Sequence, residues 1–431
     1  MAQGAALPDC FYELSMQVLS SVIGILMLIV LAYFLSEQRD RINWRTVLGA
    51  LAIQMGFAAI VLYSSVGREA LSDFSAGVQT VINYSNHGIG FLFGGLVSDR
   101  MFELFGGNGF VLALRVLPVV VFFSALVSVL YHLGIMQLIV NTLGRGLARV
   151  LGTSRPESIS ATANIFLGIS EAPLTIRPYL TSMTRSQLFA VMVGGMASVA
   201  GSVLVGYAQM GIPLEYLLAA SFMAAPAGLM MAKLMIPETE DATGCVEEQQ
   251  QEQQKPANVI DAAAQGAAQG MQVALNIGAM LLAFVGLIAL INGMLSGVGG
   301  WFGMPELSLD VVFGYLFLPF AFMAGIWDFD SAQQMAVIFG TKTTINEFVA
   351  FSQLAPMIAS GVLEPRVEVI IAFALCGFAN FGSIAVMLGS IGVMAPSRYH
   401  EIATLGVRSL VAATLANLLN ATVAGLFISL V

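Results

Sequence analysis

Long apolar runs are the feature that most restricts how this chain can fold. Of its 431 residues, 58% are hydrophobic and only 10% are charged, and the mean hydropathy is +0.85. Soluble domains carry about 25% charged residues, and a helix needs about 20 apolar residues to cross a bilayer. Several runs, such as 271–294 and 405–430, reach that length. Because these runs are much longer than a core helix of a soluble protein, the sequence predicts an all-α, polytopic membrane protein.

Residues 158–210 combine apolar segments with polar side chains at membrane depth. The run up to Glu171 is too short to span a bilayer, and two prolines interrupt the return, which predicts a re-entrant hairpin with 168–171 at its tip. The next run, 187–210, has span length, but a Gly-Gly pair weakens it, which predicts a broken helix. A carboxylate inside a membrane marks a functional site by default. Broken helices form substrate and ion sites in secondary transporters.

The second half of the chain repeats this order of parts. Glu347 lies in an apolar segment, 333–354, that predicts a second hairpin, in which Lys342 and Asn346 are the expected local partners of this carboxylate. Residues 369–394 have span length but carry Gly, Asn and Ser at their centre, and a final helix covers 405–430. Paired interrupted segments in two halves are the best pointer to a transporter's binding site. One span and an acidic linker separate the halves, so the sequence predicts an inverted repeat.

Charge and residue usage fix the topology and exclude several kinds of site. Three arginines follow the first span closely, so that loop is cytoplasmic and the N-terminus is outside. Much of the net charge of −9 lies in 237–257, and no basic patch suggests a nucleic-acid partner. The three cysteines and three histidines are scattered, which predicts neither disulfides nor a zinc site. They are Cys10, Cys245, Cys376, His87, His132 and His400.

Several motifs resemble those of the concentrative nucleoside transporter family. The first half carries GISEAPLTIRPYL, MTRSQLFAVMVGGMASVAGSVL and SFMAAPAGLMMAKLMIPE, and the second half carries TKTTINEFVA and ALCGFANFGSI. The likeness extends from about Phe91 to the C-terminus and identifies the chain as a bacterial, sodium-coupled member. It implies a homotrimer in the inner membrane. Each protomer would have eight transmembrane helices, two re-entrant hairpins, two broken helices and three interfacial helices. The residue pattern predicts amphipathic or interfacial helices at 68–83, 138–151 and 258–270.

The resemblance also implies an elevator, in which a transport domain moves against a scaffold. Residues 1–152 would form scaffold spans one to three with interfacial helices, and 258–307 would add a scaffold helix. Residues 153–236 and 308–431 would form the two halves of the transport domain. Residues 237–257 would be an acidic cytoplasmic linker.

The resemblance assigns two sets of binding residues. The base would contact Ile169, Ser170 and Glu171, and the ribose would contact Glu347, Asn380 and Ser383. Val203 and Phe378 would make apolar contacts with the nucleoside. Sodium would take side-chain oxygens of Asn164 and Ser198 and backbone carbonyls of Leu167 and Val199. A carboxylate with an amide suits the vicinal hydroxyls of ribose, and such a site rejects substrates lacking a hydroxyl by up to ~10⁴-fold. Oxygen ligands suit a hard cation.

Several alternatives stay open at this stage. The family commonly has Gln where this chain has Ile169, so Ile169 either changes base recognition or simply packs at the tip. Glu171 could be a structural carboxylate, and Asn164 a helix cap. A proton-coupled symporter of the same fold would use Glu171 or Glu347 as its proton carrier. An intramembrane hydrolase using Ser170 and Glu171 would lack a nearby general base, and the paired hairpins argue against a channel.

Overall fold

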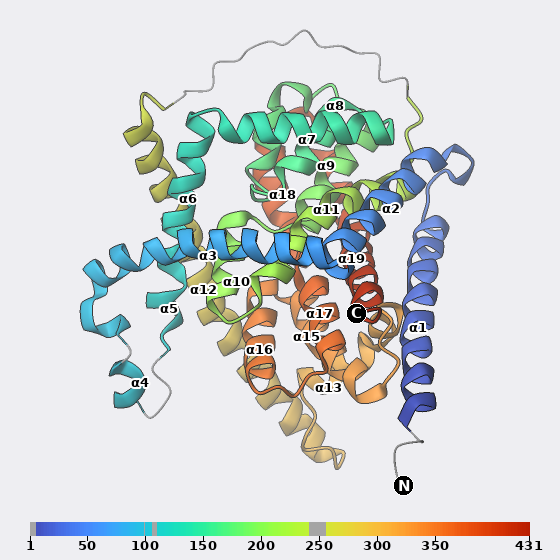
Figure 1. The fold of residues 1–431 in the computed structure, drawn as a ribbon, viewed down its shortest axis with the longest axis vertical. Coiled ribbons are helices and arrows are strands. Elements are labelled where there is room, and N and C mark those ends of the chain that lie inside the picture. The colour runs from blue at the N-terminus through green and yellow to red at the C-terminus, as the bar shows by residue number, and fades with distance from the viewer. Residues whose placement is uncertain (1–5, 99, 106–109, 241–255) are drawn as a thin grey trace.

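The computed structural model describes residues 6–98, 100–105, 110–240 and 256–431, so most of the acidic linker falls outside the described residues. Every regular element in those ranges is a helix (Figure 1). The short elements are η1 (Arg39–Arg41), η2 (Ala59–Tyr63), η3 (Gly94–Val97), α4 (Arg100–Leu104), α5 (Leu112–Arg115), α13 (Leu309–Leu316), α14 (Leu318–Met323) and η5 (Pro396–Arg398). The prediction of an all-α membrane protein is therefore confirmed for the described chain.

Within the described residues, seven helices are long and apolar enough to cross a membrane. They cover Leu14–Phe34, Trp44–Tyr63, Leu112–His132, Arg185–Gln209, Leu214–Met235, Val259–Trp301 and Pro396–Ile428. The eighth predicted span, 369–394, is divided between α17 (Pro365–Leu375) and α18 (Phe381–Met394). Neither piece alone reaches the length that a bilayer requires.

Two amphipathic helices lie crosswise to the spans. The predicted helix at 68–83 is longer in the structure, α3 (Ser65–Phe93), and α7 covers Ile135–Leu151. In Figure 1 both lie nearly horizontal, whereas α1 (Ala6–Phe34) and α6 (Leu117–His132) stand upright. This orientation fits helices that lie along a membrane interface.

Helix α12 (Val259–Trp301) differs from the expectation of a separate interfacial helix at 258–270 followed by a span. It is one continuous helix of 43 residues, or about 65 Å at 1.5 Å per residue, about twice the thickness of the hydrocarbon core. Two glycines let it approach α6 closely. A side-chain carbon at Gly266 would lie 2.7 Å from the Ser124 carbonyl oxygen, and one at Gly270 2.8 Å from Val121 Cα.

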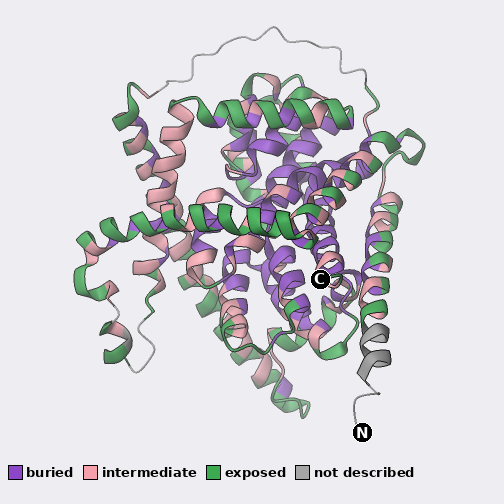
Figure 2. Ribbon diagram, in the orientation of Figure 1, coloured by how far each residue is buried: buried purple, intermediate pink, exposed green. Residues whose placement is uncertain are grey.

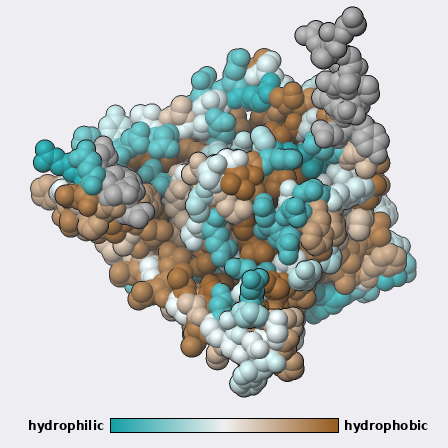
Figure 3. Space-filling view, turned by 90° about the horizontal axis from the view of Figure 1, so that it is seen from below, coloured by the Kyte–Doolittle hydropathy of each residue, from teal (hydrophilic) through white to brown (hydrophobic). Residues whose placement is uncertain are grey.

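The buried core consists of helices from both halves of the chain. Figure 2 shows it as the purple interior around α9 (Arg185–Ala197), α11 (Leu214–Met235), α17 and α19 (Tyr399–Ile428). About nine-tenths of the α11 span is buried, against 6% of the α12 span. Helices that are apolar all round belong in a core or a membrane. The outer flanks show broad apolar areas in Figure 3, and α12 exposes Leu275, Leu282, Leu290 and Trp301.

Four interruptions of helices meet inside this core. In the first half, α8 (Arg155–Ala163) is followed by a turn and by η4 (Ala172–Tyr179), and α9 is separated from α10 (Gly201–Gln209). In the second half, α15 (Phe329–Thr344) gives way to α16 (Glu347–Ala359), and α17 to α18. Asparagine side chains cap α16 and α18 by accepting backbone N–H groups, as asparagine favours.

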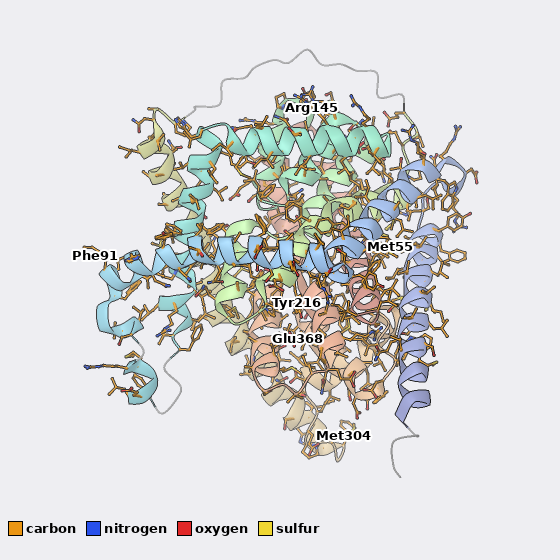
Figure 4. All side chains as sticks on the ribbon, viewed as in Figure 1. Met55, Phe91, Arg145, Tyr216, Met304 and Glu368 are labelled. Atoms are coloured by element: carbon orange, nitrogen blue, oxygen red, sulfur yellow. The ribbon has the colours of Figure 1, made fainter. Side chains whose placement is uncertain are left out.

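The two halves approach the centre from opposite ends. In Figure 1, α8 and α9 lie toward the top, whereas α15 and α16 lie toward the bottom. In Figure 4, Tyr216 of α11 and Glu368 of α17 lie near the middle of the view, while Phe91 and Met304 lie at its margins. The interruptions meet in the buried interior, where the Gly201 N–H donates to the Phe166 carbonyl and the Phe378 N–H donates to the Ser198 carbonyl.

Candidate functional site

A carboxylate with fixed hydrogen-bond partners forms the centre of the second-half site. Glu347, the first residue of α16, is buried. Its Oε1 accepts from the Tyr207 hydroxyl at 3.0 Å, and its Oε2 accepts from Asn380 Nδ2 at 3.0 Å. Asn380 Oδ1 in turn accepts from the backbone N–H of Ser383 at 3.0 Å and its hydroxyl at 3.2 Å. The structure thus brings together three residues that the sequence assigned to the sugar.

Tyr207 is a member of this site that sequence reasoning missed. It lies in α10, fully buried, with its ring stacked on Phe351 at 4.3 Å and edge-on to Phe348 at 5.1 Å between centroids. A buried tyrosine hydroxyl needs a partner, and Glu347 provides it. The feature of the sequence that could have identified it is one tyrosine at the end of an apolar run, one helical turn after the predicted contact Val203.

The first-half site contains a buried amide without hydrogen-bond partners. Asn164 is 1% exposed, and neither its Oδ1 nor its Nδ2 has a partner in the structure. A side-chain carbon at Gly194 would lie 3.4 Å from Asn164 Nδ2, and the Gly194 carbonyl accepts from the Ser198 hydroxyl at 2.9 Å. Asn164 and Ser198 therefore face the same turn of α9. Buried polar groups are almost always satisfied, so this amide is poised for a ligand.

Backbone carbonyls beside Asn164 belong to non-helical chain. Leu167 lies in the turn after α8, and Val199 lies between α9 and α10. No backbone N–H of the described chain is seen to donate to either carbonyl. The turn and the break are joined by the Gly201 N–H, which donates to the Phe166 carbonyl at 3.1 Å. All four predicted ion ligands thus lie on two interruptions that are held against each other.

Direct contact joins the breaks of the two halves. The Phe378 N–H donates to the Ser198 carbonyl at 3.1 Å, which ties 376–380 to 198–200. Phe378 and Ser198 were assigned to different ligands from the sequence, and the structure makes them neighbours. The predicted ion site and the predicted sugar site are therefore adjacent.

The predicted hairpin tip, 168–171, has few contacts with the cluster around Glu347. Ile169 is buried, and a side-chain carbon at Gly195 would lie 3.1 Å from its Cγ1. Ser170 is exposed. The Glu171 carboxylate accepts from the Gly168 N–H in its own turn at 3.2 Å, and within the described chain no hydrogen bond joins it to Glu347. In the structure, the tip and the cluster around Glu347 are therefore separate groups.

Lys342 and Asn346, the expected local partners of Glu347, make their hydrogen bonds to other residues, although the charge of Lys342 still acts on the Glu347 carboxylate. The Lys342 ammonium donates to the Ala374 carbonyl at 2.6 Å and to Asn417 Oδ1 at 3.0 Å. Asn346 caps α16 through the Val349 N–H at 2.9 Å. The side chain of Lys342 leaves the hairpin for α17 and α19 because carbonyls at a helix C-terminus attract a cation.

The chemistry of the site is that of binding. It offers a carboxylate, two amides and hydroxyls in an apolar interior, and the described residues contain no group of three or more His, Cys, Asp or Glu side chains that could hold a metal. The oxygens around Asn164 are neutral and hard, which suits an alkali cation.

Comparisons with known proteins identify the family. Models described as Na+ dependent nucleoside transporter, N-terminus and C-terminus, match residues 23–96 and 216–425, and one described as Gate: Nucleoside recognition matches 113–214. An uncharacterized transporter of Haemophilus influenzae is 54% identical, covering 96% of this chain and 99% of that protein. Nucleoside permease NupC of Helicobacter pylori is 46% identical, covering 96% and 98%.

Solved structures agree with this assignment. A variant of CNTnw in an outward-facing state is 52% identical, with a TM-score of 0.95 over 97% of this chain and 100% of that one. The relatives are transporters, and the family models name sodium as the coupling ion. The chain belongs to the concentrative nucleoside transporters, the family of sodium-dependent nucleoside transporters.

Proposed function

We propose that this protein is a symporter that imports one nucleoside with sodium across the inner membrane, with its N-terminus outside. The observation that carries the proposal is the unpartnered Asn164 amide beside Ser198, next to the hydrogen-bonded cluster around Glu347. The Asn164 amide would coordinate the cation, and the cluster around Glu347 would present fixed polar atoms to the sugar. The Phe378–Ser198 hydrogen bond makes them neighbours.

Glu347, Asn380 and Ser383 would bind the ribose hydroxyls. Tyr207 holds one carboxylate oxygen of Glu347 and Asn380 holds the other, so the acceptor is oriented before substrate arrives. Preorganisation of this kind raises affinity by lowering the ordering cost of binding. Val203 and Phe378 would contact the nucleoside through apolar surface. Ile169, Ser170 and Glu171 would face the base.

Sodium would bind where the first hairpin meets the first break. Asn164 and Ser198 would supply side-chain oxygens, and Leu167 and Val199 would supply carbonyls. Sodium bound there would hold the turn after α8 against 198–200, and through Ser198 it would order the segment that carries Phe378. Binding of the ion would therefore raise nucleoside affinity, and reciprocity requires the nucleoside to raise sodium affinity equally.

Movement would follow an elevator mechanism in a homotrimer. Residues 1–152 and 258–307 would form the scaffold. Residues 153–236 and 308–431 would form two inverted, hairpin-containing halves of the transport domain, and 237–257 would be a cytoplasmic linker. The exposed apolar face of α12 supports its place at a contact with lipid or with another protomer. The opposite approach of α8 and α16 supports the inverted repeat.

The ion gradient is sufficient for accumulation. One charge moving inward gains about 2.3 kcal/mol per 100 mV, and a tenfold sodium gradient adds about 1.4 kcal/mol. Together they sustain a nucleoside gradient of roughly 500-fold at one sodium per nucleoside.

Uptake into proteoliposomes tests the proposal. Radiolabelled uridine and adenosine would be offered under an inward sodium gradient, and then with choline replacing sodium at fixed pH. We expect accumulation above the external concentration only with sodium. Equal accumulation in choline that collapses with a protonophore would instead establish proton coupling. The uridine-to-adenosine ratio reports the base preference.

A further inference from the structure

Two buried side chains outside the binding residues connect the breaks of both halves. Asn417, in the middle of α19, and Lys342, near the end of α15, are each fully buried. Asn417 Nδ2 donates to the Ala197 carbonyl at 2.7 Å and to the Cys376 carbonyl at 2.8 Å. The Ala197 carbonyl ends α9, and the Cys376 carbonyl ends α17.

Lys342 contacts both Asn417 and the end of α17. Its ammonium donates to Asn417 Oδ1 at 3.0 Å and to the Ala374 carbonyl at 2.6 Å. Within the described chain it has no carboxylate at ion-pair distance, so its charge compensates the carbonyl end of α17. We call these two side chains, with the carbonyls of Ala197, Ala374 and Cys376, the carbonyl junction.

The backbone is shaped to bring the junction together. A side-chain carbon at Gly377 would lie 2.4 Å from Asn417 Oδ1 and Nδ2 and 2.8 Å from the Ala197 carbonyl oxygen. Only glycine therefore allows the two breaks to approach Asn417 this closely. The next residue, Phe378, donates its N–H to the Ser198 carbonyl. The junction lies directly behind the residues assigned to sodium and to nucleoside.

We propose that Asn417 and Lys342 are positioning residues that couple the sodium site to the nucleoside site. Neither touches a ligand. Asn417 fixes the spacing between the end of α9, which carries Ser198, and the end of α17, which leads into Phe378 and Asn380. Ordering of one break by its ligand is thereby transmitted to the other. The inference rests on the proposed sodium symport.

Two substitutions separate coupling from folding. Asn417→Ala removes all contacts of the amide. Asn417→Asp is nearly isosteric and keeps an acceptor for Lys342, but it replaces the donor to the Ala197 and Cys376 carbonyls with a repelling oxygen. Asn420→Ala is the matched control, because Asn420 lies one turn later on α19 and accepts from Gln54 Nε2 at 2.5 Å, away from the junction.

The measurement is equilibrium binding of uridine to purified protein in detergent, without sodium and with saturating sodium. The readout is the ratio of the two dissociation constants, which a merely structural role would not move. Allosteric ratios are typically about 5 to 150. We expect the wild-type and Asn420→Ala ratios to fall in this range. For both Asn417 variants we expect a ratio near one.

The outcomes distinguish this inference from the proposed function. A wild-type ratio above five that persists in folded Asn417→Asp and Asn417→Ala protein would overturn the role of the junction and leave symport intact. A wild-type ratio of one, with uridine bound, would overturn sodium coupling itself and the inference with it. Melting curves and gel filtration establish that each variant is folded.

Discussion

Removal of the Asn164 amide should change stability in opposite directions with and without sodium. The side chain has two buried polar atoms with no partner, and each such atom costs about 1–3 kcal/mol. Asn164→Ala removes both. It opens a cavity of roughly 25 Å³, which costs about 0.6 kcal/mol. The sodium-free variant should therefore be more stable than the wild type by about 1 kcal/mol or more.

Sodium should reverse that order. At a concentration 100-fold above its Kd, a bound ion stabilises the folded protein by about 2.7 kcal/mol. The variant lacks a ligand for the ion and should lose most of this gain. Large domains melt about 2 °C higher per kcal/mol. We expect the variant to melt about 2 °C above the wild type in choline and about 3 °C below it in sodium.

Melting curves of purified protein in matched sodium and choline buffers provide the assay. Asn420→Ala is the control, because it also truncates a buried asparagine but should keep the wild-type sodium shift. If Asn164→Ala melts below the wild type in choline and keeps the full sodium shift, Asn164 is a structural residue. The ion site would then have to be sought elsewhere.

Three further substitutions test other parts of the site. Glu347→Gln should lower uridine uptake about tenfold to a hundredfold by weakening charge-assisted hydrogen bonds, and 3′-deoxyuridine uptake should fall less; equal losses would contradict a sugar contact. Ile169→Gln should change the uridine-to-adenosine uptake ratio, and an unchanged ratio would mean that Ile169 only packs. Lys233→Met should destabilise the fold by about 3–5 kcal/mol, because Lys233 Nζ lies 2.7 Å from the buried Glu157 carboxylate; a double variant with Glu157→Gln should recover much of the loss in melting temperature.

The elements that could be predicted from the sequence are the membrane spans, which follow from the apolar bilayer, and the helix breaks, which follow from local backbone chemistry. Apolar runs give spans because a bilayer leaves no other place for them. The break predicted in 187–210 is present at 198–200, just after the Gly194–Gly195 pair that was expected to cause it, and Asn380 caps the helix after the second break. These signals are local, so a single sequence contains them. The family resemblance then supplied residue roles that local chemistry alone does not.

Contacts across long stretches of sequence were the part that could not be predicted. Lys342 was expected to pair with Glu347, five positions away, because sequence distance was the available guide. In the folded chain its partners are Ala374 and Asn417. Tyr207 was overlooked for the same reason, since its acceptor is Glu347, in the other half. Which buried polar groups meet depends on helix packing, and local pattern does not encode it.

The buried polar groups of this core nevertheless obey one rule that a sequence reader can apply. Every ionisable or amide side chain in an apolar helix must find a partner or a ligand, because an unsatisfied group costs about 1–3 kcal/mol. Asn417 satisfies the rule with three hydrogen bonds, whereas Asn164 has no partner among the described residues and so needs a ligand to satisfy it. Both are asparagines in apolar surroundings, so sequence alone makes them equivalent. The difference between them supports the proposals that Asn417 is a structural link and that Asn164 binds the ion.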